Sequence, residues 1–312
     1  MKSTATLSML ALVAAGAAQA GGHAGCQTVT FSDVGWTDIT ATTATASLIL
    51  EAMGYEPEVR VLSVPVTYTA MAEGDVDIFL GNWMPTMEGD IASYREAGTV
   101  DTVRANLQGA KYTLATNAAG AALGIADFAD IAANADALDN TIYGIEPGND
   151  GNRLILDMIA QDAFGLGGAD FDVRESSEQG MLAQVDRLTG DDEPIVFLAW
   201  EPHPMNANFD LTYLTGGDDF FGPDLGGATV FTNTRAGYVE DCANMGAFLN
   251  NLEFSLAMEN EIMGAILNDG EDPEDAARAW LAANSEVLGT WLDGVTTFDG
   301  GDAMAAVKAA LN

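Results

Sequence analysis

The sequence predicts an α/β fold of two lobes, and three observations support this prediction. Apolar runs of strand length alternate with helical segments along most of the chain. Such alternation is typical of a parallel sheet, because each helix carries the chain back to the start of the next strand. The chain has 312 residues, 48% of them hydrophobic, which is enough for more than one core. We assign 21–116 and 209–312 to one lobe and 117–208 to the other.

The elements are expected in the following order. A first strand at 28–34 leads into a helix that Thr37 or Asp38 caps and that ends near Met53, with Gly54 after it. Further strands are expected at 58–64, 76–80, 112–116, 141–145, 172–175 and 194–200, with helices at 151–163 and 178–188. Two more strands, LTYL and ATVFT, follow, and helices end the chain.

Residues 1–20 do not belong to the expected fold. MKSTATLSMLALVAAGAAQA has Lys2, an apolar stretch and a small-x-small site that ends at Ala20. This pattern is typical of a secretory signal peptide and is too short to span a membrane well. We therefore expect export to the periplasm and a mature chain that begins near Gly21.

The cysteine count agrees with export. Only Cys26 and Cys242 are present. In an oxidising compartment two cysteines favour one disulfide. The stretch HAGC offers an alternative, in which Cys26 is acylated as in a lipoprotein, but it lacks the usual Leu or Val three residues before the cysteine.

The net charge of −36 excludes nucleic acid as a partner, because little could neutralise phosphates. The acids are spread along the whole chain, which favours a surface adapted to salt. Attraction of a cationic ligand is compatible with the same charge.

An enzyme is not expected. The histidines are His23, near the processed N-terminus, and His203, between two prolines. The sequence has no serine-nucleophile motif, metal-spaced cluster or phosphate loop. The acidic stretches GGDDFFGPD and NDGEDPED lack the spacing of an EF-hand, so we interpret them as solvated loops without metal. No cofactor is expected.

Three tryptophans fall where predicted strands end. The stretch DIFLGNWMPTMEGD puts Trp83 on the turn after an apolar strand, and Trp36 and Trp200 also come at strand ends. In open α/β sheets, ligands bind at the carboxyl ends of the strands. We therefore expect these three side chains in a cleft. Trp280 and Trp291 lie at helical spacing among Ala and Leu, which favours packing in the core.

Several aromatic rings around one cleft suit a quaternary ammonium ion. Such an ion has no N–H group to donate, whereas the negative faces of aromatic rings attract it. Tyr112, which opens the strand at 112–116, could supply a fourth ring. Each face contributes about 0.5–2 kcal/mol, and micromolar affinity needs about 8 kcal/mol. Four rings together with burial of the methyl groups are therefore of the right order.

Longer motifs carry a resemblance that covers nearly all of the expected mature chain. The chain closely resembles the choline-binding proteins of bacterial ABC importers, within the glycine-betaine/choline group of substrate-binding proteins. The resemblance implies a type II periplasmic binding fold, whose two lobes are joined by two crossings and close on choline. It also implies a monomer that delivers choline to an ABC permease. The motifs are FSDVGWTDITATTATASLILEAMGY, VLSVPVTYTAM, FLGNWMPTM, YGIEPGNDGNRLI, ESSEQGMLAQV, AWEPHPMN, GGATVFTNTRAGY and FSLAMENEIM.

The resemblance further implies six ligand-binding positions. Four form an aromatic box around the trimethylammonium group, and two make polar contacts with the ligand. The box comprises Trp36, Trp83, Tyr112 and Trp200, and the polar contacts come from Asp38 and Asn149.

Asp38 should decide between choline and glycine betaine. It lies in the first turn of a predicted helix, where the dipole favours its charged form. A charged Asp38 could accept a hydrogen bond from the choline hydroxyl but would face the carboxylate of betaine. We expect Arg153, the nearest basic residue, to pair with an acid. We therefore expect choline to bind more tightly than betaine, with acetylcholine also weaker.

Two alternatives stay open at this stage. The first is a binding protein for glycine betaine or another methylated osmolyte, since these ligands share the ammonium group. The second is a ligand sensor domain, although the sequence has no signalling module.

Overall fold

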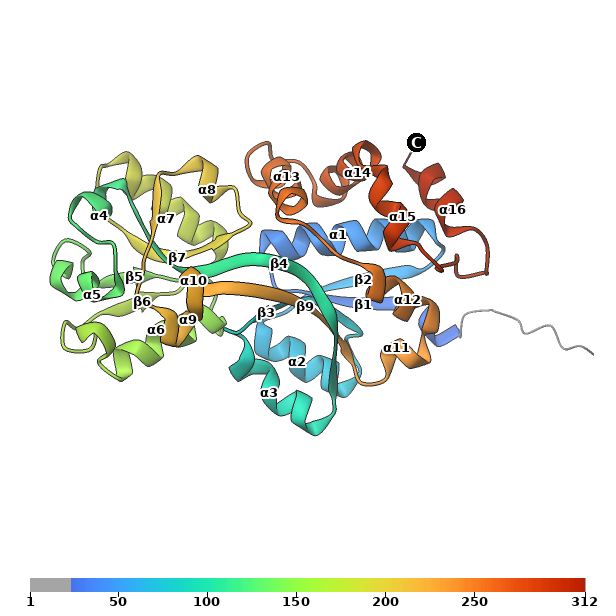
Figure 1. The fold of residues 1–312 in the computed structure, drawn as a ribbon, viewed down its shortest axis with the longest axis horizontal. Helices are drawn as coiled ribbons and strands as arrows, with labels where there is room; N and C mark the ends of the chain where they lie inside the picture. Colours follow the sequence, from blue (N-terminus) through green and yellow to red (C-terminus); the bar gives the residue numbers. More distant parts are fainter. Residues whose placement is uncertain (1–23, 312) are drawn as a thin grey trace, which may run out of the picture.

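The computed structural model describes residues 24–311. The predicted signal peptide at 1–20, its cleavage site and His23 lie outside the described residues. The described chain forms two α/β lobes side by side along the long axis of the molecule, which confirms the predicted fold class (Figure 1). None of the described helices is both long and apolar enough to cross a membrane.

The strands form one curled sheet in the order β2-β1-β3-β9-β4-β7-β5-β6, with β8 paired to β4. The strands are β1 (Thr28–Asp33), β2 (Glu56–Val61), β3 (Ile78–Met84), β4 (Val100–Asn117), β5 (Thr141–Tyr143), β6 (Asp172–Arg174), β7 (Val196–Glu201), β8 (Leu211–Tyr213) and β9 (Gly227–Arg235).

Helices cover the sheet in both lobes (Figure 1). Those of the first lobe are η1 (Ala24–Cys26), α1 (Thr37–Ala52), α2 (Val64–Glu73), α3 (Glu88–Ala97), α11 (Tyr238–Asp241), α12 (Ala243–Asn251), α13 (Leu256–Leu267), α14 (Pro273–Ala283), η4 (Ser285–Val287), α15 (Leu288–Trp291) and α16 (Ala303–Ala310). Those of the second lobe are α4 (Ala118–Ala122), α5 (Phe128–Ile131), η2 (Ala132–Asn134), α6 (Asp150–Ala160), η3 (Ala163–Gly165), α7 (Glu178–Gly190), α8 (Met205–Asn208), α9 (Asp218–Phe221) and α10 (Pro223–Gly226).

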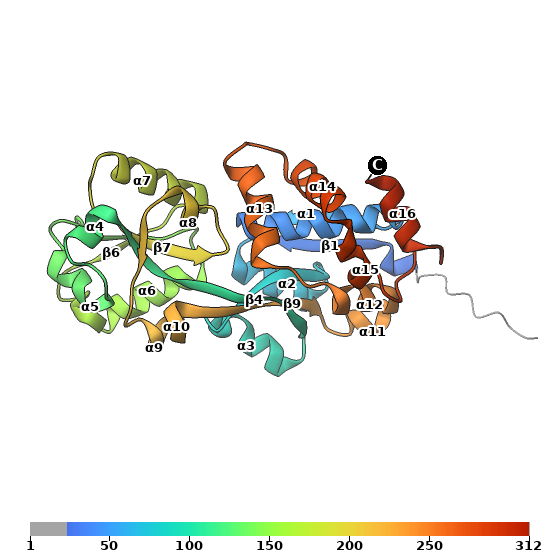
Figure 2. The ribbon, with the colours of Figure 1, turned by 45° about the horizontal axis from the view of Figure 1, so that its top comes forward.

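Each lobe contains a parallel group of strands. β1 pairs in parallel with β2 and β3, and β5 pairs in parallel with β6 and β7. The long strands β4 and β9 run antiparallel beside each other between the lobes (Figure 2). The expectation of a parallel sheet is therefore right for the two groups and wrong for the joining strands. One strand leaves the first lobe and the other returns to it, so their directions must be opposite.

The segment after β7 contacts the second lobe. β8 pairs with residues 115–117 of β4, and the ring of Phe221 in α9 lies 5.9 Å from the ring of Phe128 in α5. From these contacts we propose that the chain returns to the first lobe along β9. That point is later than the boundary between 208 and 209 that the sequence predicts.

Two local expectations are wrong. α1 begins at Thr37, with Trp36 as its N-cap, and the side chain of Trp36 makes no capping hydrogen bond. Neither Thr37 nor Asp38 is therefore the cap. β3 continues to Met84 across a register shift, so Trp83 belongs to the strand and pairs with Val230 rather than lying on a turn.

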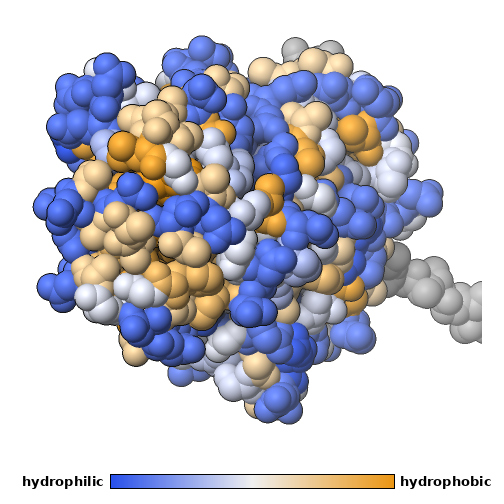
Figure 3. Space-filling view, turned by 60° about the vertical axis from the view of Figure 1, so that its left-hand side comes forward, coloured by the Kyte–Doolittle hydropathy of each residue, from blue (hydrophilic) through white to orange (hydrophobic). Residues whose placement is uncertain are grey.

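The surface of the second lobe is mostly hydrophilic. In the view of the second lobe in Figure 3, hydrophilic residues surround smaller apolar areas. Leu123 and Leu156 are the large apolar side chains exposed on this lobe, among the residues that the structure describes.

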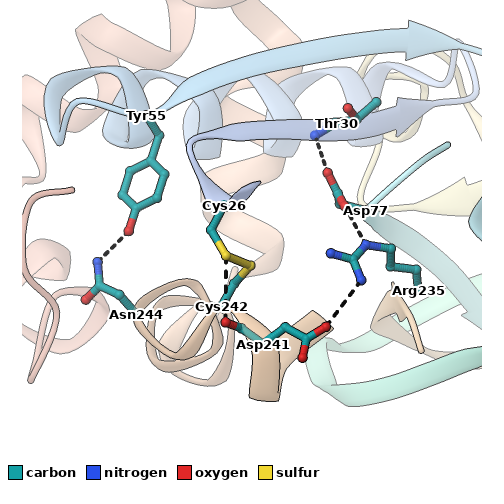
Figure 4. Close-up of a disulfide and its surroundings, with 8 residues drawn as sticks. All are labelled: Cys26, Thr30, Tyr55, Asp77, Arg235, Asp241, Cys242 and Asn244. Carbon is teal, nitrogen blue, oxygen red and sulfur yellow. Dashed lines mark hydrogen bonds and ion pairs between the residues drawn. A yellow bond between two sulfur atoms is a disulfide. The ribbon is translucent and has the colours of Figure 1, made fainter. Parts of the chain in front are cut away.

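The predicted disulfide is confirmed between Cys26 and Cys242, whose Cα atoms are 5.7 Å apart (Figure 4). Close to it, the Nε atom of Arg235 donates to Oδ1 of Asp77 at 2.7 Å, and Oδ2 of Asp77 accepts from the backbone of Thr30 at 2.9 Å. The bridge and this ion pair both fasten the first strand to the part of the chain that returns along β9.

Replacing Cys242 with Ser should lower the free energy of unfolding by about 3–5 kcal/mol, because the bridge closes a loop between residues 216 positions apart. Denaturant unfolding of the variant and the parent would measure this loss. Two reactive thiols in unreduced, denatured parent protein would contradict the bridge itself.

Candidate ligand-binding site

A cavity of about 270 Å³ lies where the two lobes meet. All six residues that the resemblance implies are brought together there, and two further residues join them. The lining residues are Trp36, Asp38, Trp83, Tyr112, Ile145, Asn149, Asp150 and Trp200.

Strand pairing sets the positions of three rings. Tyr112 on β4 lies directly opposite Trp200 on β7, with ring centroids 6.1 Å apart at an angle of 82°. The ring of Trp83 on β3 lies 6.1 Å from that of Tyr112, at an angle of 64°. Edge-to-face packing of this kind keeps aromatic faces from covering one another. The rings can therefore offer faces to a ligand.

Carboxyl groups fix the two indoles that come from the first lobe. The Nε1 atom of Trp36 donates to Oε1 of Glu146 at 2.8 Å, across the boundary between the lobes. The Nε1 atom of Trp83 donates to Oδ2 of Asp38 at 3.1 Å. Each indole N–H is thus satisfied, and the orientation of each ring is set by an acid.

Asn149 organises the second-lobe side of the cavity. It is the N-cap of α6, where its Oδ1 accepts from the backbone of Gly151 and Asn152 and from the hydroxyl of Tyr112 at 2.9 Å. A Cβ atom at Gly151 would lie 2.0 Å from the hydroxyl oxygen of Tyr112, so this close approach requires glycine. Since Oδ1 of Asn149 is occupied, only the NH₂ group of its side chain could contact a ligand. The nitrogen of that group, Nδ2, already donates one hydrogen bond to Asp150 at 3.1 Å.

Burial strongly affects the acids of the cavity. It raises the pKa of Asp38 to about 8, and the charge of nearby Glu178 adds to the rise. Burial likewise raises the pKa of Asp150 to about 6 and that of Glu146 to about 7. The expectation that the helix dipole keeps Asp38 charged is therefore wrong at neutral pH, because the loss of hydration outweighs the dipole.

Each of the two lining carboxyl groups has an oxygen without a partner. Oδ1 of Asp38 and Oδ2 of Asp150 are buried and accept no hydrogen bond from the described residues. Buried acceptors of this kind are unfavourable unless a ligand meets them. A cation in the cavity would favour the charged form of both groups, and a hydroxyl group would supply a donor.

Asp150 and Ile145 were missed at the sequence level. Asp150 is the first residue of α6, directly after the predicted Asn149, and the stretch EPGNDGN contains both. An acid that opens a helix is common for reasons of dipole alone. An acid at this position therefore does not by itself indicate that its carboxyl group faces a cavity.

Three comparisons with known proteins bear on the site. A family model for the substrate-binding domain of ABC-type glycine betaine transport systems matches residues 27–283. A solved ABC-transporter choline-binding protein in complex with choline is 69% identical, with a TM-score of 0.91, over 92% of this chain and 99% of that chain. An ABC-transporter choline-binding protein in an unliganded semi-closed conformation is also 69% identical, with a TM-score of 0.85, over 92% of this chain and 99% of that chain.

Two further relatives match parts of the chain. The glycine betaine/carnitine transport binding protein GbuC of Listeria monocytogenes is 30% identical over 165 residues, which is 53% of each chain. An uncharacterised protein of Chromohalobacter salexigens is 51% identical over 129 residues, which is 41% of this chain and 83% of that protein.

Burial of the acids makes the stability of the protein depend on pH. Because the pKa of Asp38 in the folded state is about 8, above its ordinary value of 3.8, the folded form holds an extra proton between these values. The stabilisation is complete below about pH 4 and is lost as the pH rises through 8, and Glu146 and Asp150 act in the same direction.

Without ligand, Tm should therefore fall by at least about 2 °C from pH 5 to pH 8. Scanning calorimetry would measure this, and Asp38→Asn should flatten the dependence; a Tm that rises over this range would contradict it.

Proposed function

The chain belongs to the family of substrate-binding domains of ABC-type glycine betaine transport systems, and on this premise we propose that it binds choline between its lobes and delivers it to an ABC permease. The observation that carries this proposal is the composition of the cavity wall. Four aromatic rings and two carboxyl groups line it, with neither Lys nor Arg among the described lining residues. Such a wall suits a cation that has no N–H group.

The family and the matched neighbours are transport proteins rather than enzymes, and substrate-binding proteins of ABC importers act outside the cytoplasm. We further propose that segment 1–20 directs the chain to the periplasm and that the protein works as a monomer. Acetylcholine and glycine betaine would be weaker ligands.

The six predicted residues and Asp150 would divide their roles by chemistry. The rings of Trp36, Trp83, Tyr112 and Trp200 would surround the trimethylammonium group. Asp38 or Asp150 would accept a hydrogen bond from the choline hydroxyl, since each has an oxygen without a partner among the described residues. Asn149 would hold Tyr112 and Asp150 in place through its two hydrogen bonds.

The same wall disfavours glycine betaine, whose carboxylate would meet these acids. Arg153 could have offset this repulsion, but its Nη2 atom lies 2.7 Å from Oδ2 of Asp90, which confirms that it pairs with an acid. Glycine betaine stays as a second candidate because the matching family model is named for its transport. Calorimetric titration with choline and glycine betaine side by side decides between the two.

Choline should bind at least tenfold more tightly than glycine betaine, a difference of about 1.4 kcal/mol. Asp38→Asn should weaken choline binding and narrow the difference, because an amide cannot take up the negative charge that a bound cation favours on Asp38. Asp157→Asn makes the same substitution at an exposed position of α6 and is the control. Equal affinities in the parent, or a difference untouched by Asp38→Asn, would count against this assignment.

Trp83→Ala should weaken choline binding about tenfold or more, because the variant loses one ring face and the burial of methyl groups against it. Trp83→Phe should lose less, since an aromatic face survives. Calorimetry on both variants measures the effect, and Trp280→Phe, remote from the cavity, serves as the control. If Trp83→Ala bound choline as well as the parent does, Trp83 would be a packing residue.

A further inference from the structure

The hydrogen-bond acceptor at the N-terminus of α1 comes from the second lobe. The first N–H groups of a helix have no partner within the helix, and the N-cap Trp36 supplies none from its side chain. Instead the backbone N–H of Thr37 donates to Oε2 of Glu178 at 2.9 Å, and the hydroxyl of Thr37 donates to Oε1 of the same group. Glu178 lies in the first turn of α7, so a second-lobe carboxylate caps a first-lobe helix.

His203 supplies a third donor to Glu178. Its Nδ1 atom accepts from the backbone N–H of Met205 at 2.9 Å, so the proton of the neutral ring must lie on Nε2. Nε2 is 3.3 Å from Oε1 of Glu178. A carboxylate is solely an acceptor, and here three donors meet it while Glu178 and His203 are each only 1% exposed. The contact is therefore buried and internally satisfied.

This contact lies directly behind the aromatic box. Thr37 stands between Trp36 and Asp38, both of which line the cavity. The ring of His203 packs against that of Trp200, with centroids 5.0 Å apart. Glu178 itself is not among the lining residues. Its hydrogen bonds therefore connect two walls of the cavity without reaching a ligand.

A second link between the lobes offers a comparison. Arg153 of α6 pairs with Asp90 of α3, and the two side chains are 38% and 12% exposed. Water and salt screen such a pair. They screen the buried contact between Glu178 and Thr37 much less, so the latter should contribute more to keeping the lobes together.

Resting on the proposed function, we propose that Glu178 is a positioning residue that latches the closed lobes and so sets the rate at which choline leaves. Opening the lobes would break the contact and expose the N-terminus of α1. The latch acts through Thr37 on the placement of Trp36 and Asp38. Without ligand the lobes would exchange between open and closed forms, and the latch would favour the closed form. It should govern dissociation far more than association, because choline enters the open form, in which the contact is absent.

Stopped-flow tryptophan fluorescence with choline tests the latch in the full-length mature protein. Glu178→Gln keeps the shape of the side chain but turns an amide NH₂ group toward a donor. It should raise the dissociation rate constant at least tenfold and change the association rate constant less than about threefold. Thr37→Val, which removes only the hydroxyl donor, should raise the dissociation rate constant by a smaller factor. The double variant should be less impaired than the two single effects combined, because both remove the same contact.

Glu175→Gln is the matched control, since Glu175 bonds Asn152 within the second lobe. Dissociation rate constants equal to that of the parent in both Glu178→Gln and Thr37→Val would overturn the proposal, as would additive effects in the double variant. If Glu178→Gln does not fold, Thr37→Val decides alone.

Small-angle X-ray scattering without ligand separates this proposal from the proposed function. The latch predicts a larger radius of gyration for Glu178→Gln than for the parent, whatever the ligand is. An unchanged radius would contradict the latch. Failure of the parent to bind choline would contradict the proposed function. The radii of gyration without ligand would still test the latch, because they do not depend on which ligand binds.

Discussion

The site depends on carboxyl groups buried beside aromatic rings. Water is excluded from both, so the rings can attract a cation strongly, but the same exclusion raises the pKa of Asp38 to about 8. Trp83 joins the two effects, because its indole N–H bonds Asp38 while its ring lines the same cavity. A cation is the partner that both groups lack. On the proposed function, the wall favours a ligand by its positive charge, before shape is considered.

The curled sheet joins the rings of the cavity across the two lobes. Tyr112 lies on β4, one of the two strands that run between the lobes, and it contacts Trp83 on one side and Trp200 on the other. The remaining ring, Trp36, reaches Glu146 of the second lobe only when the lobes meet. The overall match to a choline-bound structure is closer than that to a semi-closed one, with TM-scores of 0.91 and 0.85.

The sequence predicted which residues line the cavity better than it predicted the local structure and electrostatics around them. The alternation of strands and helices was enough for the α/β class, and motif resemblance was enough for the six positions that meet at the cavity. Trp83, however, lies within a strand, because pairing with β9 extends β3 beyond its apolar run. The cap of α1 could not be predicted, since Glu178 is 141 positions from Thr37. The raised pKa of Asp38 could not be predicted either, because the local sequence reveals the helix dipole but not the burial that opposes its effect.

The acids of the surface and those of the site act over different distances. The charge of −36 is spread over the chain, and salt at physiological strength screens exposed charges beyond about 8 Å. Such charges aid solubility and the encounter with a cation, but they contribute little to holding it. Asp38 and Asp150 are buried, with 2% and 1% exposure, and salt does not reach them. On the proposed function, salt should therefore change the affinity for the cation little, because the groups proposed to hold it are separated from the groups that face the solvent.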